Sequence, residues 1–122
     1  MSGKDHALEN LLELEGTRFV IDEERGLWVK FDVKLITPTS IRPHGIRYSL
    51  SLHDRHNNRM MGFDNAHAIE HGGKVNVAPI RTYDHWHRDQ DDKGRPYAFV
   101  NAGKLLEDFW VEVDKAIKKL ER

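Results

Sequence analysis

Hydrophobic and polar residues alternate most regularly along residues 27–36, where every second side chain is apolar. Because successive side chains of a strand point to opposite sides, this period of two predicts a strand with one buried face. Residues 17–22 are rich in β-formers, and a polar turn at residues 23–26 separates them from the alternating stretch. The two segments therefore predict a β-hairpin.

The same alternation returns along residues 46–53, after a loop at residues 37–45 that contains two prolines. It predicts a third strand. Residues 54–58 are polar and include two asparagines, which favours a turn, and residues 59–64 then predict a fourth strand paired with the third. Four consecutive strands with short connections are typical of an antiparallel sheet.

The next part of the chain is less regular. Residues 74–79 predict a weak strand, residues 82–88 predict the last strand, and residues 89–95 form a strongly polar loop. Because side chains alternate along a strand, the last strand has two sides of different chemistry. One side would carry His85 and His87, and the other Asp84, Trp86 and Arg88.

A helix is predicted at each end of the chain. Residues 5–15 carry leucines at helical spacing, with Asp5 as N-cap and Gly16 as the stop. From Gly103 to the end, apolar residues recur every three or four positions, and Asn101 is the candidate cap. We predict an α+β fold in which an antiparallel sheet of four to six strands packs against the C-terminal helix, with a short N-terminal helix.

Composition narrows the class of protein. At 122 residues the chain is long enough for one domain, so residues 1–122 are expected to form a single α+β domain. Its 19 basic and 20 acidic residues leave no strong overall positive field, although a local basic face remains open. Absence of cysteine excludes disulfides and thiolate chemistry. Without an apolar signal-like start or membrane span, we expect a cytoplasmic protein with no membrane association.

Candidate chemistry concentrates in two segments, GFDNAH at residues 62–67 and TYDHWHR at residues 82–88. A carboxylate beside an imidazole fixes its tautomer and raises its basicity, which suits histidine for acid–base catalysis. The segments supply two aspartates and three histidines, namely Asp64, His67, Asp84, His85 and His87. The other five histidines are interpreted as structural or exposed, namely His6, His44, His53, His56 and His71.

Two uses of these residues fit the sequence. In metal-free cleavage of RNA, His85 and His87 would transfer protons, Arg88 or Arg81 would bind phosphate, and Tyr97 would donate a hydrogen bond. Alternatively, the same histidines would join an aspartate as ligands of one divalent ion such as zinc, manganese or iron. The metal candidates are Asp64, His67, His85 and His87. No HExxH motif is present, so the cofactor is either none or one divalent metal.

With these residues in view, the chain resembles the TumE-type family of toxins from prokaryotic toxin–antitoxin modules. The resemblance is carried in order by YSLSLHD (48–54), GFDNAH (62–67), YDHWHR (83–88), GRPYAFVNA (94–102) and LLEDFWVEV (105–113). It implies a toxin held in check by a partner antitoxin, usually a helix-turn-helix DNA-binding protein. RNA cleavage, the commonest activity of small toxins, follows by analogy. His67 is followed by Ala68 where some relatives carry a second histidine, which argues against paired histidines there.

Two rival functions belong to other classes. A non-catalytic binding module would use the polar cluster as a docking surface, with an exposed apolar patch around Trp86 and Trp110. A metal-dependent hydrolase or transferase acting on a small molecule would instead have a deep pocket. The sequence leaves open whether the protein forms a homo-oligomer and whether the two candidate segments meet in space.

Overall fold

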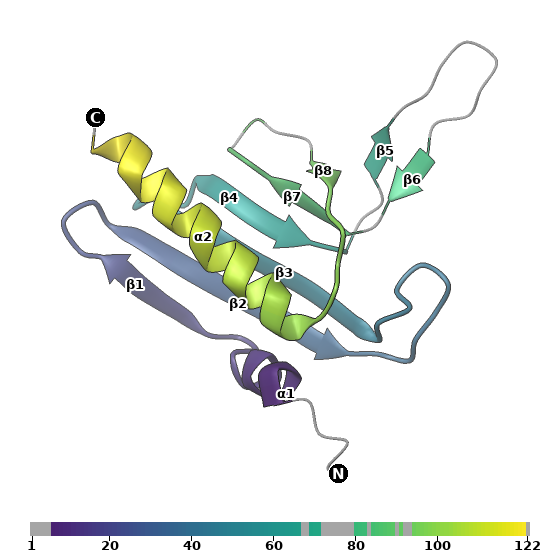
Figure 1. The fold of residues 1–122 in the computed structure, drawn as a ribbon. Coiled ribbons are helices and arrows are strands. Elements are labelled where there is room, and N and C mark those ends of the chain that lie inside the picture. Colours follow the sequence, from purple (N-terminus) through teal and green to yellow (C-terminus); the bar gives the residue numbers. More distant parts are fainter. Residues whose placement is uncertain are drawn as a thin grey trace.

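The computed structural model describes residues 6–66, 69–71, 80–82, 84–89, 91 and 94–121. Its elements follow in the order α1 (His6–Glu13), β1 (Arg18–Asp22), β2 (Leu27–Leu35), β3 (Ile46–His53), β4 (Arg59–Asp64), β5 (Ile69–His71), β6 (Ile80–Thr82), β7 (His85–His87), β8 (Arg95–Pro96) and α2 (Ala102–Leu120). A six-stranded antiparallel sheet has the order β1-β2-β3-β4-β7-β8, and β5 pairs separately with β6. Helix α2 runs across one face of the large sheet (Figure 1), which confirms the predicted α+β architecture.

Strand register explains how the sequence makes one face of the sheet apolar. Phe31 lies opposite Leu50, and Leu50 in turn lies opposite Phe63, so the apolar side chains of three strands share one face. Phe31 and Leu50 are fully buried. Burying a side chain of this size stabilises the fold by about 1.5–3 kcal/mol. The alternation of residues 27–35 and 46–53 therefore sets both the strands and the core.

Helix α2 covers this apolar face with a stripe of buried side chains at helical spacing. Its cap is Asn101, whose side-chain oxygen accepts a hydrogen bond from the Lys104 N–H at 2.8 Å, as the sequence predicted. Phe109 meets the ring of Phe31 edge-on at 5.5 Å and that of Phe63 at 6.4 Å. Within the described residues, no helix is long and apolar enough to span a membrane.

The structure differs from the sequence prediction between β4 and α2. The predicted last strand at residues 82–88 is divided, because β6 ends at Thr82 and β7 begins at His85. Strand β8 falls partly in the predicted loop at residues 89–95 and was missed, since two residues carry no periodic signal. Pro96, which has no N–H to donate, is tolerated there because β8 is the edge strand. The predicted strand at residues 74–79 lies outside the described residues.

The face of the large sheet opposite α2 is polar, and we call it the helix-free face, because no helix among the described residues packs on it. Cross-strand partners share a face, so strand register assigns its members. From β1 to β3 they are Arg18, Val20, Trp28, Lys30, Asp32, Lys34, Arg47, Ser49, Ser51 and His53, all polar, charged or aromatic except Val20. Register then adds Arg59, Gly62 and Asp64 on β4 and His85 and His87 on β7.

Candidate functional site

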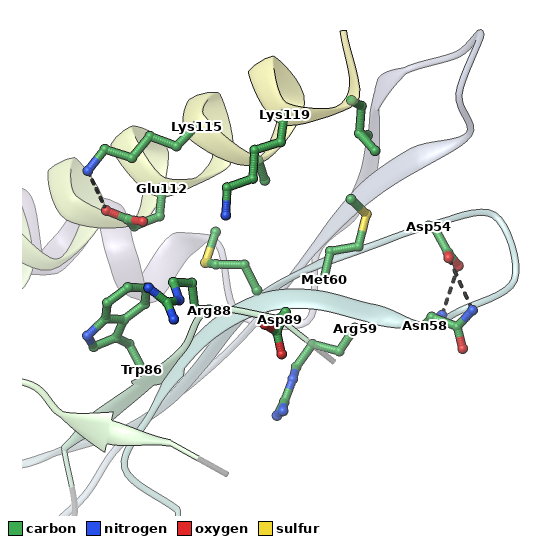
Figure 2. A pocket seen from close by; sticks show the side chains of 13 residues that line it. Asp54, Asn58, Arg59, Met60, Trp86, Arg88, Asp89, Glu112, Lys115 and Lys119 are labelled. Carbon is green, nitrogen blue, oxygen red and sulfur yellow. Dashed lines mark hydrogen bonds and ion pairs between the residues drawn. The ribbon is translucent and has the colours of Figure 1, made fainter. Parts of the chain in front are cut away.

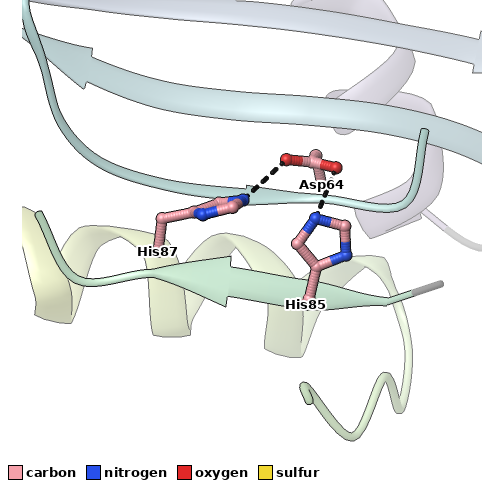
Figure 3. Close-up of side chains that lie close together, drawn as sticks. All are labelled: Asp64, His85 and His87. Carbon is pink, nitrogen blue, oxygen red and sulfur yellow. Dashed lines mark ion pairs between the residues drawn. The ribbon is translucent and has the colours of Figure 1, made fainter. Parts of the chain in front are cut away.

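Asp64, His85 and His87 meet on the helix-free face and form what we call the Asp64 cluster (Figure 3). Asp64 lies directly opposite His85 in the pairing of β4 with β7, and His87 is two residues further along β7. His85 Nε2 lies 3.0 Å from Asp64 Oδ1, and His87 Nε2 lies 3.3 Å from Asp64 Oδ2. The two candidate segments therefore meet in space, and one carboxylate contacts two imidazoles.

The Asp64 cluster is largely shielded from solvent. His85 and His87 are 2% and 6% exposed, whereas 16% of the Asp64 side chain is accessible. Burial by itself would raise the pKa of Asp64, but hydrogen bonds and charge from the two histidines outweigh burial and hold that pKa well below its usual range. Asp64 is therefore ionised at neutral pH and orients both rings.

The same geometry also fits a metal ion. One ligand atom from each of Asp64, His85 and His87 lies within 4.8 Å of the other two. Two imidazole nitrogens and one carboxylate oxygen form a donor set suited to zinc, manganese or iron, with positions left for water. His67, the fourth metal candidate, lies outside the described residues.

Asp84 belongs to a second cluster rather than to the Asp64 cluster. Because it precedes His85 on the strand, its side chain points to the side that α2 covers. It accepts a hydrogen bond from the Tyr48 hydroxyl at 2.7 Å and lies 2.9 Å from His44 Nε2. Burial and the neighbouring Asp84 carboxylate raise the pKa of Tyr48 far above its ordinary value.

His44, which the sequence analysis interpreted as structural or exposed, has defined partners in the structure. Its ring contacts Phe99 at a centroid distance of 4.0 Å, and its Nε2 contacts Asp84, forty positions along the chain. Sequence reasoning missed the pair because no local spacing links them. Tyr48 offered the available signal, since a tyrosine at a core position needs a partner for its hydroxyl.

Tyr97 and Arg88, two further predicted site residues, lie away from the Asp64 cluster, whereas the Arg81 side chain lies outside the part of the chain that the structure describes. Tyr97 donates its hydroxyl to Asp108 of α2 at 2.7 Å, and burial together with that carboxylate raises its pKa. Tyr97 therefore ties the chain before α2 to the helix and stays protonated. Arg88 follows β7 and lines a groove on the side of α2 (Figure 2).

A buried asparagine, also missed from the sequence, holds the end of β4 in place. Asn65 is fully buried, accepts the Tyr48 N–H at 2.9 Å and donates to the Ile46 carbonyl at 2.8 Å. Arg42 reaches the same turn and donates to the carbonyls of Asn65 and Ala66 at 2.9 and 3.0 Å. These bonds fix the backbone beside Asp64 and so help to position its carboxylate.

Two of the cavities formed by the described residues bear on the candidate site and its surroundings. The larger, about 550 Å³, is the groove of Figure 2, between β4, β7 and the C-terminal half of α2. Its lining includes Met60, Met61 and Trp86, but none of the Asp64 cluster. The smaller cleft, about 280 Å³, is lined by Asp32, Lys34, Arg47, Tyr48, Ser49 and Ala66. Ser49 is the cross-strand partner of Asp64, so the smaller cleft borders the Asp64 cluster.

Comparison with models of known protein families gives a match over most of the chain. The family model described as Toxin TumE matches residues 9–117, which is most of the chain and includes both clusters. No curated protein and no solved structure matches the chain. The family match agrees with the resemblance seen in the sequence segments and supports a toxin component. The chain therefore belongs to the TumE toxin family.

Proposed function

We propose that this toxin is an endoribonuclease whose reaction takes place at the Asp64 cluster. The observation that carries the proposal is the contact of two imidazoles, on His85 and His87, with one ionised carboxylate. Cleavage of an RNA strand by its own 2′-hydroxyl needs one group that removes a proton and another that supplies one. Two histidines held by a shared aspartate provide such a pair.

In the proposed reaction one imidazole accepts the proton of the ribose 2′-hydroxyl, and the resulting oxygen attacks the adjacent phosphorus. The bond between phosphorus and the 5′-oxygen breaks, and the second imidazole, in its protonated form, gives a proton to that leaving oxygen. The products are a 2′,3′-cyclic phosphate and a 5′-hydroxyl. Asp64 keeps both rings oriented and stabilises whichever ring is positively charged.

The substrate would reach the cluster from the side of the smaller cleft, because Asp64 is the most accessible of its three members. Arg47 lines that cleft without an ion pair among the described residues, and Lys34 lines it while paired with Glu15, so we assign phosphate binding to Arg47 first and to Lys34 beside it. Arg88, the residue chosen from sequence, lines the groove beside α2 instead.

One observation supports the metal-dependent alternative. The possible ligand atoms of Asp64, His85 and His87 all lie within 4.8 Å of one another. In that case the three residues would hold a divalent ion, and a water bound to the ion would be the nucleophile. A hydrolase or transferase acting on a small molecule through the same ion is the corresponding rival.

A toxin of this family implies an antitoxin partner, which we propose to be of the helix-turn-helix type. The groove of Figure 2 supports protein docking, since Met60, Met61 and Trp86 give it an apolar floor and Lys119 stands at its rim. Trp86 is stacked against Phe63 at 5.9 Å, which leaves that side of the indole closed to a nucleobase. We propose that the groove receives an apolar side chain of the antitoxin flanked by acidic residues.

The test of the proposed activity is cleavage of end-labelled RNA by the purified protein, with and without a chelator. His85→Gln and His87→Gln are expected to lower the cleavage rate by at least about 10²-fold, the usual contribution of one acid–base group. His56→Gln is the matched control, because His56 is exposed in the turn after β3. Equal cleavage rates in wild type and in the three variants, or no cleavage by any of these four proteins, would contradict the proposal.

A further inference from the structure

The helix-free face carries an excess of positive charge although the chain as a whole has a formal net charge of −1. Arg18 lies opposite Lys30 in the pairing of β1 with β2, and Lys34 lies opposite Arg47 in the pairing of β2 with β3. Two of these four cations have an acidic partner, since Lys30 pairs with Asp32 at 3.4 Å and Lys34 pairs with Glu15. Because side chains alternate along β1, β2 and β3, these cationic side chains lie on the same face of the sheet.

Two of these cations are available to a partner. Neither Arg18 nor Arg47 forms an ion pair with another described residue, and both are exposed. The lysines on α2 differ, because most of them are paired along the helix. These pairs are Lys104 with Asp108, Lys115 with Glu112 and Lys118 with Asp114. An anionic partner therefore gains more from the helix-free face than from the surface of α2.

Aromatic rings lie at one end of the same face. The rings of Trp28 and His53 are stacked at 4.4 Å with an interplanar angle of 17°, and the Arg18 guanidinium lies 5.9 Å from the Trp28 ring. The indole N–H donates to the Asp54 carbonyl at 2.9 Å, which fixes the stack. Burial lowers the pKa of His53, so its ring is neutral at pH 7. Flat rings and guanidinium planes are the surfaces on which unpaired bases stack.

The stack and the smaller cleft lie at opposite ends of the β2–β3 ladder. Trp28 pairs with His53 at one end and Lys34 with Arg47 near the other, six residues away along β2. At the rise of a strand this separation is about 20 Å. The cations of β1, β2 and β3 lie along this distance. The smaller cleft at the far end borders Asp64, because Ser49 lines the cleft and is the cross-strand partner of Asp64. A stretch of several nucleotides therefore fits between the stack and the cluster.

We propose that the helix-free face binds single-stranded RNA, with unpaired bases against the stack of Trp28 and His53 and phosphates on Arg18, Lys30, Lys34 and Arg47. The inference rests on the proposed ribonuclease function, for which it names the form of the substrate and its route to Asp64. Single strands are favoured over duplexes because stacking on the protein requires bases that are not paired.

Binding is measured by fluorescence anisotropy with a short unstructured RNA that carries 2′-O-methyl groups, so that cleavage cannot occur. Arg47→Ala is expected to weaken binding several-fold and to reduce the slope of log K against log salt by about 0.7, the effect of one phosphate contact. Trp28→Leu is expected to weaken binding about 5- to 100-fold through lost stacking. Lys118→Ala is the matched control, because Lys118 is 71% exposed on α2 and paired with Asp114.

The inference is overturned if Arg47→Ala and Lys118→Ala bind the RNA with equal affinity, or if a duplex of the same sequence binds more tightly than the single strand. Arg47 is exposed, so its variant keeps the test valid should Trp28→Leu fail to fold. Measuring the cleavage of unmodified RNA beside the binding of the methylated RNA separates the two proposals. Binding without cleavage by wild type would support the surface and refute the ribonuclease. Cleavage by wild type together with RNA binding that Arg47→Ala leaves unchanged would support the ribonuclease and refute the proposed binding surface.

Discussion

Replacing Asp64 by asparagine tests the electrostatic description of the cluster. The substitution keeps the shape of the side chain but removes the charge that lies 3.0 and 3.3 Å from two buried imidazoles. A hydrogen bond to a charged group contributes about 1.5–3 kcal/mol, and the amide can still bond one of the rings. We therefore expect Asp64→Asn to lower the free energy of unfolding by about 2 kcal/mol at neutral pH.

The effect should depend on pH with a definite sign. The pKa of Asp64 is depressed in the folded protein, so its contribution is fully present above the ordinary aspartate pKa of about 3.9 and is lost as pH falls toward the folded value. The difference between wild type and Asp64→Asn should accordingly shrink as pH falls below about 4.

Urea unfolding monitored by circular dichroism at several pH values measures the free energy of unfolding and its dependence on pH. Asp32→Asn is the matched control, since Asp32 lies on the same face, has 46% of its side chain exposed and pairs with Lys30 at 3.4 Å. It should change the free energy of unfolding by less than about 1 kcal/mol. The reasoning is refuted if Asp64→Asn matches wild type at neutral pH, or if its deficit persists undiminished in acid.

Two further predictions concern the other side of the sheet. Tyr48→Phe removes the hydrogen bond to Asp84 and leaves that carboxylate short of a partner, so the free energy of unfolding in urea should fall by about 1.5–3 kcal/mol. RNA cleavage should stay at the wild-type rate. Lost cleavage with an intact fold would show that the second cluster takes part in the reaction. Lys119→Glu should weaken binding to the antitoxin about tenfold, measured by calorimetry, because it introduces charge repulsion at the groove. Lys118→Glu should leave this affinity unchanged. Equal affinities of the two variants would place the antitoxin elsewhere.

Much of the fold is predictable from local pattern. The alternation of residues 27–35 and 46–53, the apolar stripe of residues 102–120 and the cap at Asn101 correctly indicated two central strands and the covering helix. These signals are strong because one buried face fixes every second or every third to fourth residue. Strand β8 has two residues and belongs to a long-range pairing, so no local pattern marks it.

The candidate site was predictable only in part. The spacing of His85 and His87 placed both rings on one side of a strand, and the structure adds that Asp64 lies opposite His85 and contacts both rings. By contrast, the contact of His44 with Asp84 depends on how the loop before β3 folds back. Strand alternation had already put Arg88 on the side opposite the two histidines, and in the structure Arg88 lines the groove beside α2.

The chemistry of the RNA ends tests the central claim most directly. End-labelled RNA is incubated with the purified toxin in the presence of a chelator, and the new termini are identified by mass spectrometry. The proposed mechanism predicts 2′,3′-cyclic phosphates and 5′-hydroxyls, formed by wild type and His56→Gln and lost in His85→Gln and His87→Gln. Termini with 3′-hydroxyls that vanish on chelation would assign Asp64, His85 and His87 to a metal ion, and RNA left intact by the wild-type protein would contradict a ribonuclease altogether.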